Sequence, residues 1–242
     1  MKFHSAILAA AILAVPAVQA QTVFDFANLT NGGPSNFLPS NGVNCTGGDK
    51  CSSDVSSVLN GGLTFLSGGI SVTATASYNG SAFGTTAAVV QDHEDGYNGL
   101  LSGPTAIGAG LGVYHRTNDN SDDNITNGEA LRLQFNQTVS LSAIGLRSDG
   151  HNTTGWNSNN TFQYSFDNSS WVNAALPLNV GQHYLSQTTS DLYVRYGGGN
   201  ANQFYLSSLT VAAVPEPQTY AMLLAGLGLL GVAARRRKAL KA

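Results

Sequence analysis

The chain has 242 residues and a formal net charge of −3. Six of its 11 Lys and Arg residues lie in the first 20 or last 29 positions, whereas 13 of its 14 Asp and Glu residues lie between these ends. Residues 21–213 therefore carry five basic and 13 acidic side chains, a net charge near −8. A surface of this charge makes nucleic acids and anionic membranes poor partners.

Residues 1–20 have the pattern of a signal peptide. Lys2 precedes an apolar run over residues 6–15, and the small side chains of Val18 and Ala20 suit a signal peptidase. We therefore expect cleavage before Gln21 and export of the remaining chain. The alternative, a membrane helix that stays in place, needs a longer apolar run.

Residues 21–213 are long enough for one hydrophobic core and predict a single domain. They are rich in Asn, Ser, Thr and Gly, which disfavours helices and suits short strands joined by many turns. The predicted fold is all-β, a single β-sandwich of jelly-roll type. Apolar and polar positions alternate, in chain order, at residues 22–29, 62–78, 87–91, 110–116, 130–147, 160–176, 191–196 and 203–214.

Two of these segments predict β-hairpins. In residues 130–147, a turn is expected at residues 136–137, between two runs of alternating apolar residues. In residues 160–176, three alternating aromatic side chains are expected to face the core before a turn at residues 167–169.

Two cysteines, Cys45 and Cys51, flank a short glycine-containing loop. In an oxidising compartment we expect a disulfide between them. Such a small ring stabilises the fold by less than about 3 kcal/mol, so it would fix a loop more than the fold. A metal site would instead need four ligands at a recognisable spacing, and no histidine lies nearby.

The most polar stretch, residues 115–131, raises the hypothesis of a calcium site. Four acidic side chains there offer the oxygen ligands that calcium takes: Asp119, Asp122, Asp123 and Glu129. Read as an EF-hand loop from its first aspartate, the spacing fails, because Asn124 and Ala130 stand where Gly and Glu are required. The alternative is a solvated acidic loop, which Asn and Asp favour in turns. No other cofactor is expected.

Four aromatic residues are candidates for contact with a sugar ring: Trp156, Trp171, Tyr164 and Tyr184. Trp156 lies in a polar stretch that looks exposed, where a large aromatic side chain needs an explanation, so we take it as the favoured ligand contact. Its alternative role is to anchor the loop. Trp171 follows a tight turn and is expected to pack in the core or at its rim.

The sequence predicts no catalytic site. Asp92, His93, Glu94 and Asp95 are adjacent, whereas glycoside hydrolysis requires two carboxyl groups that face each other across a cleft. A charged surface turn is the favoured interpretation. Neither a Gly-x-Ser-x-Gly elbow nor a phosphate-binding glycine loop is present.

The last segment, residues 214–242, differs in composition from the body. After Pro215 and Pro217, residues 219–234 form an uncharged run of 16 residues, which is about 24 Å of helix at 1.5 Å per residue. This is short for a hydrocarbon core of about 30 Å, but long basic side chains can extend the span. We expect a single transmembrane helix whose cytoplasmic end is formed by Arg235, Arg236, Arg237 and Lys238.

Three features in fixed order resemble the PEP-CTERM sorting signal. They are the run Val214, Pro215, Glu216 and Pro217, the short glycine-containing helix, and the terminal arginine cluster. The resemblance covers residues 214–238, about a tenth of the chain, and carries no information about the body. It implies export in a Gram-negative bacterium, processing near Pro-Glu-Pro by exosortase, a membrane-bound cysteine transpeptidase, and then release or transfer to the cell surface.

These observations predict an exported cell-surface or extracellular-matrix protein that is not an enzyme and has a structural role. Its partners would be signal peptidase, exosortase and, transiently, the inner membrane, but no nucleic acid. An alternative is a carbohydrate-binding module for extracellular polysaccharide. A third hypothesis, a glycoside hydrolase, would require separated carboxyl groups in a cleft.

Overall fold

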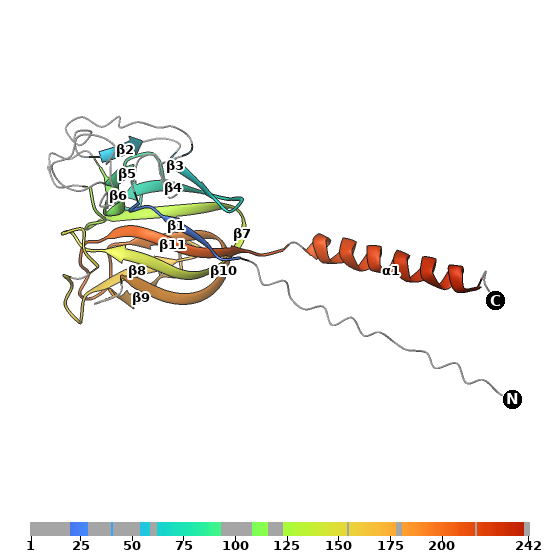
Figure 1. Ribbon diagram of the computed structural model, residues 1–242. Coiled ribbons are helices and arrows are strands. Elements are labelled where there is room, and N and C mark those ends of the chain that lie inside the picture. Colours follow the sequence, from blue (N-terminus) through green and yellow to red (C-terminus); the bar gives the residue numbers. More distant parts are fainter. Residues whose placement is uncertain are drawn as a thin grey trace.

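The computed structural model describes residues 20–28, 40, 54–58, 62–92, 108–115, 123–153, 155–177, 181–215 and 217–239. Three sequence-based predictions concern residues outside these ranges: nearly all of the signal peptide, the Cys45–Cys51 pair, and two of the proposed calcium ligands, Asp119 and Asp122. The described part contains eleven strands and one helix (Figure 1): β1 Thr22–Asp25, β2 Asp54–Val58, β3 Leu63–Ser67, β4 Ile70–Tyr78, β5 Ala88–Asp92, β6 Gly110–Tyr114, β7 Glu129–Arg147, β8 Thr161–Ser165, β9 Val172–Ala175, β10 Gln182–Arg195, β11 Tyr205–Ala213 and α1 Pro217–Ala239.

The prediction of an all-β body is confirmed, but the described strands form one hydrogen-bonded sheet rather than the two separate sheets of a jelly roll. Its order is β2-β5-β6-β11-β7-β10-β8-β9, with β1 on β11 and the β3–β4 hairpin on β7. An isolated bridge between Ala76 and Ala87 joins the β4 branch to the β5 branch. The sheet therefore curls around its core instead of stacking in two layers.

The long strand β7 is the reason for this curl. One edge of β7 pairs with β10, while its other edge pairs first with β4, over residues 129–135, and then with β11, over residues 139–147. The expected turn at residues 136–137 is wrong. Buried positions from Leu131 to Ala143 are all odd-numbered, so the alternation keeps one phase through the supposed turn, as a continuous strand requires.

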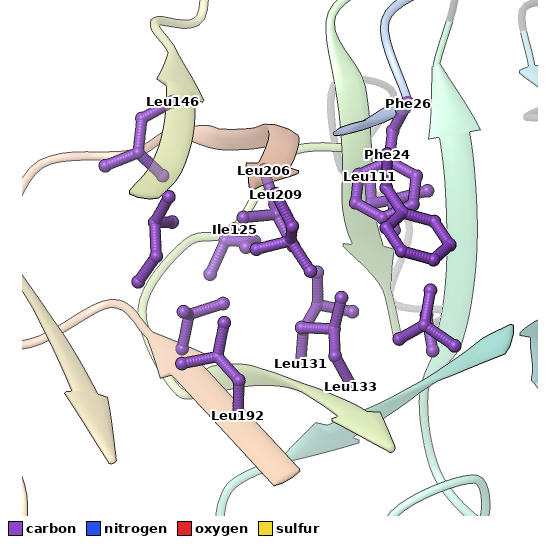
Figure 2. Close-up of a cluster of buried hydrophobic side chains, with 14 of the residues drawn as sticks. Phe24, Phe26, Leu111, Ile125, Leu131, Leu133, Leu146, Leu192, Leu206 and Leu209 are labelled. Atoms are coloured by element: carbon purple, nitrogen blue, oxygen red, sulfur yellow. The ribbon is translucent and has the colours of Figure 1, made fainter. Parts of the chain in front are cut away.

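The core fills the space enclosed by the curled sheet (Figure 2). Leu131 and Leu133 of β7 lie in it with Leu209 of β11, and all three are fully buried. Phe26, just after β1, meets Phe65 of β3 edge to face, with ring centres 4.8 Å apart. Each fully buried side chain of this size stabilises the fold by roughly 1.5–3 kcal/mol, so the core is the main source of stability.

The second predicted hairpin, β8–β9, is confirmed. The Asp167 carboxylate closes its turn by accepting hydrogen bonds from the backbone N–H groups of Ser169 (2.8 Å) and Ser170 (2.7 Å). Asn168 adopts a positive φ of 58°, which asparagine tolerates. Of the three aromatic side chains expected to face the core, Phe162 is fully buried. The other two, Tyr164 and Phe166, are partly buried and pack against the core.

This turn predicts a pH-dependent stability. Hydrogen bonds from Ser170 and Ser169 to the carboxylate lower the pKa of Asp167. The unfolded chain therefore binds the proton more readily, so the stabilisation is present above about pH 4 and is lost as the pH falls below it. Asp167→Ala should lower the thermal midpoint at pH 7, and the difference from the original chain should shrink below pH 4. Ser169→Ala is the matched control; a pH-independent effect of Asp167→Ala would contradict the account.

The predicted C-terminal helix is present as α1 and extends away from the β-body (Figure 1). The expectation that it spans a membrane is not supported. Among the described residues, no helix combines the length and the apolar character that a membrane crossing requires.

Candidate functional site

The C-terminal tail leaves the body directly from the end of β11. The backbone N–H of Val214, the residue after the strand, still donates a hydrogen bond to the carbonyl of Thr138 (3.2 Å). Pro217 is the first residue of α1, a position that proline favours because the first helical N–H groups have no partner in the helix. The segment between strand and helix, in which Glu216 itself is not described, is thus short and lies outside the sheet.

Helix α1 presents apolar side chains that the body does not cover. Five of them are between 57% and 75% exposed: Met222, Leu224, Leu229, Leu230 and Val232. Arg236, near the end of the helix, is also exposed. The tail therefore offers a proline-flanked segment, an uncovered apolar helix and a basic end to whatever processes it.

A groove of about 350 Å³ is present on the outer face of the sheet. Four neighbouring strands, β4, β7, β10 and β8, place one residue each in a common row: Ser77, Ala130, Arg195 and Gln163. Their neighbours along each strand include Leu131 and Val194, which point to the core, so this row points outward. We call this depression, with the turns at its rim, the outer groove.

Arg195 is held in a fixed position in the outer groove. Its guanidinium carbon lies 3.8 Å from the centre of the Trp171 ring, a stacked cation–π contact. Its Nε donates to Oε1 of Gln163 (2.7 Å), and Nε2 of Gln163 donates in turn to Asn173 (2.6 Å). Burial lowers the pKa of Arg195. Within the described residues Arg195 has no ion pair, unlike Arg132, whose Nη2 lies 2.8 Å from Asp191 Oδ1.

The rim of the outer groove is built from tight turns. The N–H of Asn79 donates to the carbonyl of Gly128 (2.7 Å), which joins the turn after β4 to the turn before β7. Gly128 has a φ of +85°, and a Cβ there would lie 2.5 Å from the side-chain oxygen of Asn79. Glycine is therefore required for this close approach.

Glu129 also lines the outer groove, but its oxygens already have partners. Oε2 accepts from the backbone N–H of Thr126 (2.7 Å), and Oε1 lies 2.9 Å from Nδ1 of His115. The side chain of Glu129 is fully buried. It supports the loop before β7 rather than presenting a free carboxylate to a ligand.

A second polar cluster includes Asp92, the last residue of β5. Asp92 forms an ion pair with His151 (Oδ2 to Nε2, 3.0 Å), and the His151 ring packs edge-on against Tyr205. The hydroxyl of Tyr205 donates to Oδ1 of Asp123 (2.8 Å), while Asn124 donates to Asp149 (2.7 Å). Burial, with the nearby carboxylates, raises the pKa of Tyr205.

This cluster changes two expectations. Asp92 is only 1% exposed, so its assignment to a charged surface turn is wrong; the three residues after it are not described. Of the proposed calcium ligands, Asp123 accepts from Tyr205 and Glu129 contacts Thr126 and His115. The described residues contain no group of three or more potential ligands placed to hold a metal ion. The calcium site therefore stays a prediction from the sequence.

Trp156 is not exposed, contrary to expectation. Only 7% of it is accessible, and its indole N–H donates to the carbonyl of Gln203 (3.1 Å). It packs with the core and anchors its loop, with one edge on a second, polar hollow of about 360 Å³. The apolar residues that surround Trp156 come from strands distant in sequence. They could not be inferred from the polar residues that flank Trp156 in the sequence. Its role as a ligand contact stays a prediction.

The comparisons with known proteins concern the tail. Residues 213–238 match the PEP-CTERM protein-sorting motif. No curated protein matches the chain. The matched residues begin at the last residue of β11 and include nearly all of α1, so the motif and the segment outside the sheet coincide. The resemblance expected from the sequence is confirmed.

Proposed function

We propose that this chain delivers a non-catalytic β-body with a structural role to the cell surface. The chain carries a PEP-CTERM sorting motif, which marks it for exosortase-dependent sorting to that surface. The motif match at residues 213–238 is the observation that carries the proposal. The geometry supports it, because processing between β11 and α1 would release the helix without removing a residue of the sheet. The same proposal includes cleavage by signal peptidase, transient residence at the inner membrane and a final place in the extracellular matrix.

The absence of catalysis is proposed from how the carboxylates are used. Among the described residues, the buried Asp92 and Glu129 contact His151 and Thr126 respectively, and the partly buried Asp123 contacts Tyr205. Glycoside hydrolysis needs two carboxyl groups about 5–9.5 Å apart on either side of a substrate. Of the described residues that line the outer groove, only Glu129 has a carboxylate, and both of its oxygens are engaged. Incubation with polysaccharides should therefore generate no new reducing ends.

The outer groove favours a second candidate function, carbohydrate binding. Sugars are recognised by aromatic faces together with planar amides and hydroxyl groups, and Trp171, Gln163 and three asparagines supply these groups around the groove. Its volume of about 350 Å³ is at the small end of the range for ligand sites, which is about 300–1,000 Å³. The favoured contact is thus Trp171 rather than Trp156.

Surface delivery is tested on intact cells that produce the full chain with or without exosortase. A protease added outside should degrade the body only when exosortase is present. Equal accessibility in both strains would contradict the sorting proposal, whereas protection in both would show that the body does not reach the surface.

A further inference from the structure

We propose that the ligand of the outer groove is an acidic saccharide, one that carries a ring carboxylate, and that Arg195 binds this carboxylate. The inference rests on the second candidate function and specifies its ligand. It follows from the contacts of Arg195, from the charge of the body and from the remaining groups of the groove.

The first argument is that Arg195 has unused hydrogen-bond donors. Gln163 accepts a hydrogen bond only from the Nε–H of the Arg195 guanidinium. Within the described residues, the two Nη atoms of Arg195 have no acceptor. Arg195 is only partly buried, so these donors remain accessible to a ligand. They can form charge-assisted hydrogen bonds to a ligand carboxylate.

The second argument is that the guanidinium is already oriented. The Trp171 ring stacks on it at 3.8 Å, and the chain of amides from Gln163 to Asn173 fixes its Nε side. A planar guanidinium held in this way presents its two remaining nitrogens as a fork. This fork matches the two oxygens of a carboxylate, so little side-chain freedom is lost on binding.

The third argument is selectivity. The body carries a net charge near −8, which disfavours ligands with many negative charges, whether nucleic acids or polymers of uronic acid alone, and leaves ligands with a single carboxylate. One unpaired arginine can still hold one carboxylate at short range. Around it, the side chains of Asn79, Asn127 and Asn168 line the groove and make no hydrogen bond to other described side chains, so they are available to sugar hydroxyl groups. A uronic acid residue presents this combination of one carboxylate and several hydroxyl groups.

The test is calorimetric titration of the full chain with oligosaccharides that contain a single uronic acid residue, their methyl esters and neutral oligosaccharides of the same linkage. The acids should bind more tightly than the esters, and added salt should reduce the difference. Arg195→Gln should weaken binding of the acids by about ten- to a hundredfold and leave the esters unchanged. Trp171→Ala should weaken both.

Two controls separate binding from folding. Tyr184→Ala removes a 73% exposed aromatic residue of β10 that is not part of the groove and should change neither affinity. All variants should remain folded and unfold in one cooperative transition, with only a small shift of the thermal midpoint for Arg195→Gln and Trp171→Ala. Equal binding of acids and esters, unchanged by Arg195→Gln, would overturn the acidic ligand but leave saccharide binding intact. Failure of every probe to bind the unaltered chain would overturn carbohydrate binding itself.

Discussion

Replacement of Pro215, Glu216 and Pro217 together by alanine is expected to abolish exosortase-dependent processing while the β-body stays folded. These residues lie within the matched sorting motif and outside the last strand. Alanine removes Pro215, which follows β11, and Pro217, the first residue of α1, and with them the segment that we expect exosortase to recognise. Nearly all of the protein should then remain unprocessed, as measured by immunoblotting of cell fractions.

The matched control for this change is Gln218→Ala, in the first turn of α1, which should be processed normally. The thermal midpoints of both variants should equal that of the original chain, since neither alters a residue of the sheet. Processing of the triple variant at the original rate would show that recognition does not depend on Pro-Glu-Pro.

Phe65→Ala is expected to destabilise the body by about 3–5 kcal/mol, the usual cost of removing a buried phenylalanine ring. Phe65 is fully buried on β3 and packs edge-on against Phe26, so the substitution leaves a cavity between two segments that enclose the core. Denaturant unfolding of the full chain measures the loss as a shift of the midpoint at constant slope.

Leu66→Ala is the matched control for the core prediction, because the next residue on the same strand is 62% exposed. It should change stability by no more than about 0.5 kcal/mol. A larger loss for Leu66 than for Phe65 would mean that β3 presents its opposite face to the core, since a one-residue shift of register exchanges the two faces.

Alternation of apolar residues predicted the body well where each strand keeps a single phase. The β8–β9 hairpin and its turn at Asp167 follow from local residues alone. The turn chemistry at residues 136–137 was misleading, because Asn136 lies within a strand and its side chain accepts a hydrogen bond from the backbone of Ser71 (3.0 Å). The unbroken odd-numbered phase of β7 was the better signal.

Strands with irregular pairing were harder to predict. The alternation indicated only residues 191–196 of β10, whereas the strand begins at Gln182. Its pairing with β7 shifts register between Tyr184 and Gln187 and again between Thr189 and Asp191. Each shift changes which face a residue occupies, so the alternation is lost although the strand continues.

The outer groove could not be predicted, because its residues meet only through strand register. Ser77, Ala130, Arg195 and Gln163 are far apart in sequence and become neighbours across β4, β7, β10 and β8. One signal was present: Arg195 is one of only five basic residues in an acidic body. The tail, by contrast, is a local motif read in chain order, so the sequence sufficed to identify it.

The central claim, that exosortase processes this chain at its C-terminal motif, is tested most directly by intact mass. The full chain is produced in one bacterial host with and without exosortase, and the purified product is weighed by mass spectrometry. We predict the loss of the segment after Pro-Glu-Pro only in the strain that contains exosortase. An identical mass in both strains, with the complete tail retained, would contradict the account.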